Sequence, residues 1–142
     1  MTDEGWTREV RTVSAAGAQG VLAAAMKAAA GHGLKLSIAV VDASGNLLAF
    51  QRDDGAAVTT IEAALRKART AVHLKAPTKV FEDLLHGGAT SLLAFEFISP
   101  SQGGVPLVVG GTAVVGGIGC SGGSGEEDET VAKAGAAAIV RA

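Results

Sequence analysis

Two cationic side chains interrupt otherwise apolar patterns and are the residues best placed for chemistry. Arg52 ends an alternating stretch whose Leu48 and Phe50 share its face, and Lys67 flanks the apolar stripe of a helix expected at about Thr59 to Lys75. Such a pair suits a carboxylate or propionate ligand, because both groups form charge-assisted hydrogen bonds with carboxylates. The alternative is a structural ion pair, and the candidate acids are Asp42, Asp53 and Asp128.

His73 lies about one helical turn beyond Thr70 on the same expected helix. A neutral imidazole there is able to bind iron or to act as a general base near neutral pH. The alternative is an exposed histidine that the helix dipole favours near a C-terminus. Proton transfer without a cofactor stays open, with a cation stabilising an enolate and His73 or Asp128 as the candidate catalytic base.

The sequence offers little for a metal centre or for covalent catalysis. No two of its three histidines have the spacing of metal ligands, and Cys120 has no second cysteine to pair with. The stretch GCSGG around Ser121 lacks the G-x-S-x-G spacing of a serine nucleophile. We therefore predict no tightly bound metal and no nucleophilic side chain.

Gly117, Gly119 and Gly122 have the G-x-G-x-x-G spacing of a dinucleotide-binding turn. A strand is expected before them, and a capping box at 124–127 opens a helix after them. Four consecutive acids at 126–129 crowd the first turn of that helix, where they would repel an anionic ligand. The glycines therefore predict close backbone packing and no nucleotide site.

Periodicity and turn residues predict the elements that position these residues. In chain order they are a helix at 14–30, strands at 34–42 and 47–53, a helix opened by a capping box at 59–62, a short helix at 78–85, two strands joined by a two-residue turn at Gly110-Gly111, and a helix at 126–140. On the last helix only Asp128 among the four acids falls on the inward stripe. The order predicts the α/β (α+β) class, a mainly antiparallel sheet with helices on both faces.

Composition limits the class of protein. The 142 residues are 48% apolar, which suits one domain over 1–142, and 12 basic against 14 acidic residues offer no footprint for nucleic acid. No stretch is apolar enough to cross a membrane, and a lone cysteine with no signal peptide favours the cytoplasm. The expected first helix is so rich in Ala and Gly that we expect a homo-oligomer to cover it.

Three separated stretches carry a family resemblance: VVDASGNLLAFQRDDGA, EAALRKARTA, and GGVPLVVGGTAVVGGIGCSG followed six residues later by Asp128. Together they resemble the GlcG/HbpS-like family, and also the C-terminal domain of PduO-type cobalamin adenosyltransferases. The resemblance implies a profilin-like fold with a sheet of about five strands, in oligomers built from dimers. It also implies haem or corrinoid binding, and some members are described as haem-degrading.

The family pattern falls on residues in the first turn, the capped helix and the glycine-rich end, which are Asp42, Gly45, Arg52, Lys67, Thr70, Gly104, Pro106, Gly117, Gly119, Ser121, Gly122 and Asp128. The resemblance therefore predicts a pocket between the first hairpin and the capped helix. Its ligand-binding residues would be Arg52, Lys67, Thr70 and His73, and its ligand a small molecule, haem or another tetrapyrrole. The alternatives are a cofactor-independent isomerase, cyclase or lyase in the same pocket, and a structural accessory module.

Overall fold

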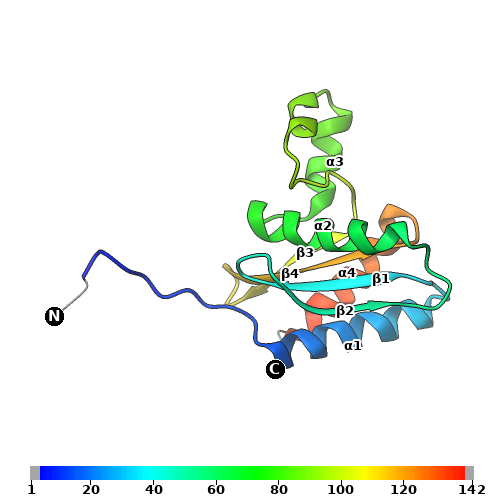
Figure 1. The fold of residues 1–142 in the computed structure, drawn as a ribbon, viewed down its shortest axis with the longest axis horizontal. Helices are drawn as coiled ribbons and strands as arrows, with labels where there is room; N and C mark the ends of the chain where they lie inside the picture. The colour runs from blue at the N-terminus through cyan, green and yellow to red at the C-terminus, as the bar shows by residue number, and fades with distance from the viewer. Residues whose placement is uncertain (1–3, 140–142) are drawn as a thin grey trace.

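The sheet has four antiparallel strands in the order β2-β1-β4-β3, in a computed structural model that describes residues 4–139 (Figure 1). The elements along the chain are α1 (Ala15–Gly31), β1 (Ser37–Asp42), β2 (Leu47–Arg52), α2 (Thr59–Leu74), α3 (Thr78–His86), the 3-10 helix η1 (Thr90–Ala94), β3 (Gly104–Val109), β4 (Ala113–Ser121) and α4 (Gly125–Ile139). The α+β class is confirmed. The expectation of about five strands is wrong, because the described residues form two hairpins and no further strand.

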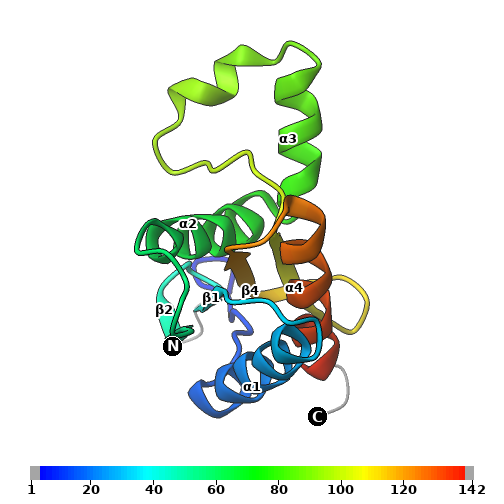
Figure 2. The same ribbon diagram turned by 90° about the vertical axis from the view of Figure 1, so that its right-hand side faces the viewer.

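Helices cover both faces of the sheet (Figure 2). α1 and α4 pack side by side on one face, where the larger core cluster includes Ile38 and Val40. α2 covers the other face over the smaller side chains of Ala39 and Val41. No helix within residues 4–139 is long and apolar enough to span a membrane.

The glycine-rich strand β4 lies directly against the backbone of α2. A Cβ atom added to Gly117 would lie 2.6 Å from the Ala68 carbonyl oxygen, and one added to Gly119 would overlap the Ala64 carbonyl oxygen. Glycine at both positions leaves no side chain between strand and helix. The close packing predicted for these glycines is therefore what the structure shows.

One predicted capping box forms and the other does not. At the start of α4 the Ser124 N–H donates to Glu127 Oε1 (2.9 Å) and the Glu127 N–H donates to Ser124 Oγ (3.1 Å). At the start of α2 no side chain caps the helix. Val58 is the N-cap residue there, and the hydroxyl of Thr60 donates to the Ala57 carbonyl oxygen (2.6 Å) and lies 2.8 Å from Ser37 Oγ in β1.

Residues 78–99 leave the body of the molecule as a loop built on α3 and η1, which we call the α3–η1 excursion (Figures 1 and 2). Most of its side chains are exposed or half-buried, and Thr78 and Ile98 are its buried residues. The next connection, between β3 and β4, has three residues and not the predicted two. Gly110 and Gly111 both adopt positive φ there, at 61° and 81°.

We expect Gly119→Ala to lower the free energy of unfolding by at least about 1–3 kcal/mol, since even a methyl group forces β4 away from α2. Gly20→Ala is the matched control, because Gly20 is exposed on α1 with nothing near its added Cβ. That control should stabilise the protein by about 0.5–1 kcal/mol. Urea unfolding of both variants measures this, and equal stabilities would contradict the close packing.

Candidate functional site

Lys67 and Asp128 form a buried ion pair that joins α2 to α4. Lys67 Nζ lies 3.2 Å from Asp128 Oδ2 and donates a hydrogen bond to the Cys120 carbonyl oxygen (3.0 Å). Asp128 Oδ1 accepts from the Gly123 N–H (2.9 Å), and the two charged side chains are 6% and 3% exposed. The structural alternative weighed for Lys67 is thus realised, with Asp128 as the acid.

Burial controls the protonation of this region. It raises the pKa of Asp128, against the opposing effects of the Lys67 charge and the Gly123 N–H. Burial also raises the pKa of the Cys120 thiol far above its usual value, and the Asp128 charge adds to the effect. Cys120 is therefore a neutral thiol inside the sheet.

Thr70 is fully buried and fastens the returning end of the α3–η1 excursion to α2. Its hydroxyl oxygen accepts from the Ser99 N–H (2.8 Å), and the hydroxyl lies 2.8 Å from the Arg66 carbonyl oxygen and 3.3 Å from that of Phe97. The Thr70 hydroxyl is therefore occupied by backbone contacts. They place Phe97 beside α2.

Arg52 is exposed at the end of the edge strand β2. Its guanidinium donates to the Ala56 carbonyl oxygen (3.2 Å), and the described residues show no interaction between it and Lys67. Alternation places Arg52 on the same face as Phe50, but that face is not covered at the end of the strand, where Arg52 is exposed. At an edge the guanidinium stays hydrated and needs no acidic partner.

His73 is exposed on α2 among aromatic and cationic neighbours. Its ring packs edge-on against Phe97, with centroids 6.2 Å apart, and Phe97 packs against Phe95 at 5.9 Å. One turn earlier Arg69 Nε donates to the Gly45 carbonyl oxygen (3.0 Å), which holds the first hairpin turn beside the imidazole. We call His73, Phe95, Phe97 and Arg69 the His73 surface. A cavity of about 380 Å³ opens there, lined by His73, Leu74 and Phe97.

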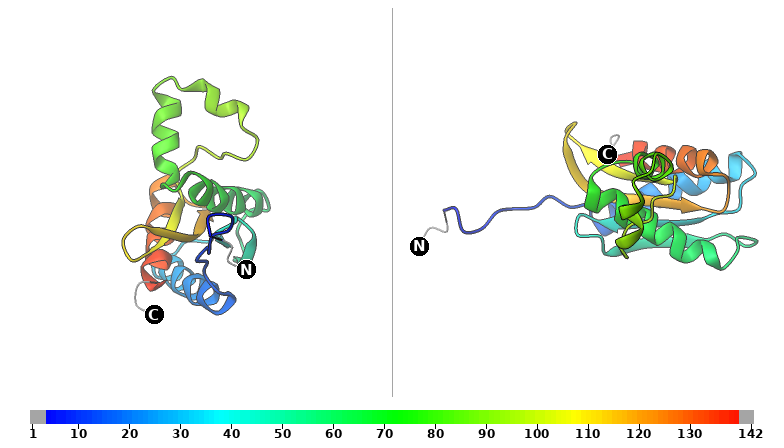
Figure 3. Two further views of the ribbon diagram at one scale, coloured as in Figure 1. Left: turned by 90° about the vertical axis from the view of Figure 1, so that its left-hand side faces the viewer. Right: turned by 90° about the horizontal axis from the view of Figure 1, so that it is seen from above.

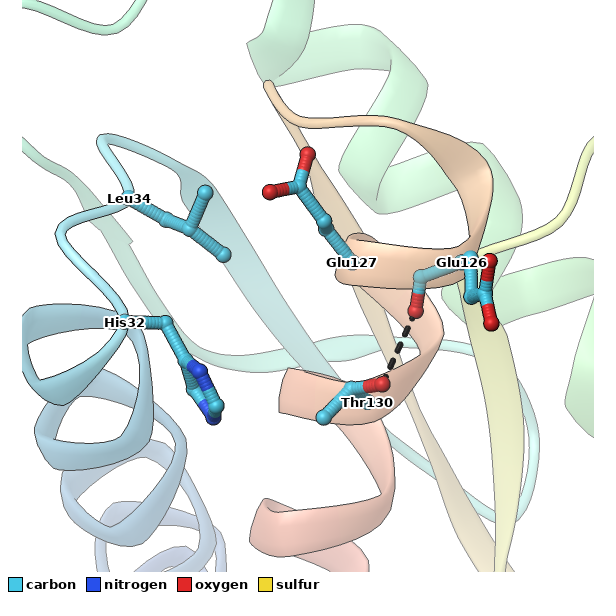
Figure 4. Close-up of a pocket in the computed structure, with 5 residues that line it drawn as sticks. All are labelled: His32, Leu34, Glu126, Glu127 and Thr130. Carbon is cyan, nitrogen blue, oxygen red and sulfur yellow. Dashed lines mark hydrogen bonds between the residues drawn. The ribbon is translucent and has the colours of Figure 1, made fainter.

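A second cavity, of about 270 Å³, lies between the C-terminus of α1 and the first turn of α4 (Figure 4). Its polar lining includes His32, Glu126 and Glu127, but the two carboxylates do not converge on the imidazole ring. Within residues 4–139 no group of three or more His, Cys, Asp or Glu side chains is arranged to hold a metal ion. We assign no function to this cavity.

Comparison with known proteins assigns the family. Residues 13–137 match the family model described as haem degrading protein HbpS-like. The chain belongs to the HbpS-like family. It is 36% identical to the protein GlcG of Escherichia coli K12 over 104 residues, which are 73% of this chain and 77% of GlcG.

Solved structures of HbpS-like proteins share the fold. HbpS superposes with a TM-score of 0.88 at 38% identity, over 96% of each chain. A haem complex of PduOC superposes with a TM-score of 0.81 at 27% identity, over 89% of this chain and 94% of that one. A double mutant of Streptomyces reticuli HbpS gives 0.87 at 37% identity, over 96% and 93%.

Sequence reasoning missed most of the His73 surface. Of the four predicted binding residues the structure exposes Arg52 and His73, and it buries Lys67 and Thr70. The two phenylalanines come from a return loop whose position against α2 depends on a contact between residues 29 apart, Thr70 and Ser99. The signal in the sequence that could have pointed to them is the stretch FEF at 95–97, in which the two phenylalanines alternate with a glutamate.

Glu129 departs from the expectation that it points away from the core. It is 8% exposed, and its Oε1 pairs with Lys133 Nζ at 2.9 Å. Glu129 Oε2 is buried without a hydrogen-bond partner among the described residues. Two of the four acids at the start of α4, Asp128 and Glu129, are therefore buried.

We expect Lys67→Met to cost about 3–5 kcal/mol of stability at neutral pH, because it leaves the Asp128 carboxylate buried without its cation. Burial raises the pKa of Asp128, so the folded variant binds a proton that the unfolded chain releases. The loss of stability should thus be full at a pH above the pKa that Asp128 has in the folded variant. It should shrink as the pH falls from there toward the usual pKa range of aspartate. Urea unfolding against pH measures it, with the exposed Lys27→Met as control. A loss independent of pH would contradict this account.

Cys120 should resist thiol reagents in the native protein, since its thiol is buried and its pKa is raised. Modification of Cys120 should be as slow as global unfolding of the native protein, and it should be immediate in denaturant. A Ser44→Cys variant supplies an exposed thiol for comparison and should be modified at once. Counting labelled sites over time by mass spectrometry tests this, and rapid native labelling of Cys120 would show an open sheet.

Proposed function

We propose that this chain is a small-ligand-binding protein whose ligand is haem or another flat, acidic tetrapyrrole, and that the His73 surface holds it. The observation that carries the proposal is the meeting of an exposed imidazole, two phenyl rings and a guanidinium beside one cavity. Family membership and the haem complex of the structural neighbour PduOC support the choice of ligand.

The residues present fit such a group. Histidine nitrogen is a common ligand of haem iron, and the His73 side chain is exposed to solvent. Phe95 and Phe97 would pack against the apolar ring, and Arg69 would pair with a propionate. Bound haem would supply redox chemistry at iron, while this chain supplies the ligand, the apolar cover and the cation. Of the four residues expected from sequence, the proposal keeps His73 in contact with the ligand and gives Thr70 the role of positioning Phe97.

We propose further that the protein works as a homo-oligomer. The His73 surface is open on one molecule, whereas ligand sites enclose most of the ligand surface. Large apolar side chains are exposed along the α3–η1 excursion next to it, namely Val80, Leu84, Leu93, Phe95 and Phe97. A second subunit over this face would cover them and complete the enclosure.

The cytoplasmic location expected from the sequence stays a prediction.

The enzymatic alternative, a cofactor-independent isomerase, cyclase or lyase, would draw on the same surface. Of its two candidate bases, Asp128 is held in the buried ion pair with Lys67. His73 is the candidate that a substrate reaches from solvent. Turnover of a small carbonyl compound without haem would favour this alternative.

Haem titration tests the proposal. His73→Ala should change the Soret band of the complex, because it removes the iron ligand. Arg69→Ala should weaken binding by about 1.5–3 kcal/mol through loss of a charge-assisted hydrogen bond. His86→Ala and Arg66→Ala are matched controls, exposed residues of the same types away from the cavity lining, and should bind as the parent does. Equal affinities and spectra for all four variants would remove the His73 surface as the site.

A further inference from the structure

The N-terminal segment of residues 4–12, here the N-terminal arm, runs away from the folded body (Figures 1 and 3). Its base is fixed, since the Val13 N–H donates to the Val115 carbonyl oxygen (2.8 Å) and the Ala43 N–H donates to Thr12 Oγ1 (3.0 Å). Further out Trp6 is 91% exposed and Val10 57%. The arm thus carries the chain's one tryptophan, with a large apolar surface, into solvent.

The arm has the composition of a β-strand. From Trp6 to Thr12 its sequence, WTREVRT, consists of aromatic or β-branched residues and charged ones, and the aromatic and β-branched residues favour an extended backbone that is able to pair with a strand. The structure assigns neither helix nor strand to residues 7–14. Between Trp6 and Val13 it has no Gly, Pro, Asn or Asp to reverse its direction. The arm is therefore poorly suited to fold back onto its own body.

The β3 edge of the sheet is closed to a further strand. Alternation along the β3–β4 ladder turns the backbone groups of Gly104 and Pro106 outward, because the neighbouring Gly103 accepts a ladder bond from Cys120. The Gly104 N–H already donates to Thr78 Oγ1 (2.9 Å), and Pro106 has no N–H. Proline on an edge strand is a common protection against added strands.

The β2 edge is open by comparison. The Asp53 N–H donates to the Leu36 carbonyl oxygen (3.0 Å), which fixes the ladder so that Phe50 and Arg52 turn their backbone groups outward. β2 contains no proline, and no strand within residues 4–139 lies on its outer side. Asp53 and Asp54 follow directly at its end, and Asp54 is exposed.

We propose that the N-terminal arm of one chain pairs, through residues 8–11, with the β2 edge of a second copy. Every chain carries one strand-like arm and one open edge, so a reciprocal exchange between two copies satisfies both. Arg8 and Arg11 on the arm complement the exposed Asp54 beside the edge, whereas Asp53 already pairs with Lys35 (3.9 Å). The exchange adds a fifth strand to each sheet. It does not depend on haem or on the His73 surface.

Trp6 is a built-in reporter for this exchange, because it is the only tryptophan of the chain. The full-length protein without haem is diluted over several orders of magnitude, and its mass is followed by sedimentation together with Trp6 emission and acrylamide quenching. On assembly we expect the mass to double, the emission to move to shorter wavelength and the quenching to fall. Mass and fluorescence should follow one dissociation curve.

Variants on both partners locate the contact. Val10→Pro removes an arm N–H, and Arg52→Pro removes an outward edge N–H without touching a β1–β2 ladder bond. Each should weaken assembly by about tenfold or more, equal to 1.4 kcal/mol. Val10→Thr and Arg52→Thr keep the N–H and should assemble like the parent. Circular dichroism confirms that each variant is folded.

Three outcomes would overturn the proposal. Trp6 exposure that does not change while the mass doubles would show that the arm is outside the contact. Assembly insensitive to Val10→Pro but abolished by Arg52→Pro would show β2 pairing with β2 of the second copy. Assembly insensitive to both variants would place the interface elsewhere, for example on the α3–η1 excursion. Haem titration of the same variants separates these results from the proposed function, because the exchange leaves the His73 surface unchanged.

Discussion

The rest of the structure depends on the direct contact between strand β4 and the backbone of helix α2. Gly117 and Gly119 make it possible, because a Cβ atom at either position would collide with a carbonyl oxygen of the helix. The close approach sets the depth at which α2 lies over the sheet. It lets Lys67 reach past the strand to the Cys120 carbonyl oxygen and to Asp128 on α4. One contact therefore joins the two helical layers through the sheet.

This arrangement separates the charges that support the fold from the groups that are available for chemistry. Lys67 and Asp128 are buried and neutralise each other, so they join α2 to α4 inside the protein. The side of α2 away from the sheet carries Arg69 and His73, which the first hairpin turn and the α3–η1 excursion border. A helix held rigidly on one face is a good support for a binding surface on the other.

Several features followed from local sequence alone. The order of helices and hairpins, the capping box at Ser124 and the packing role of the glycines in β4 were all predictable, because each depends on residues close together in the chain. The box at Thr59 did not form because α2 begins one residue earlier than the box requires, with Val58 as the N-cap residue and Thr59 already inside the helix. Arg52 failed as a buried cation because alternation does not tell an edge strand from a central one.

The sequence by itself determined the α+β class, the family and the two residue types, cation and imidazole, that stand out on α2. Only the tertiary structure decided which cation is buried, which acid it meets and which aromatic residues surround His73. The physical reason is that local patterns record which face of an element is apolar. They do not record which distant element covers that face, and the desolvation of a charge depends on that cover.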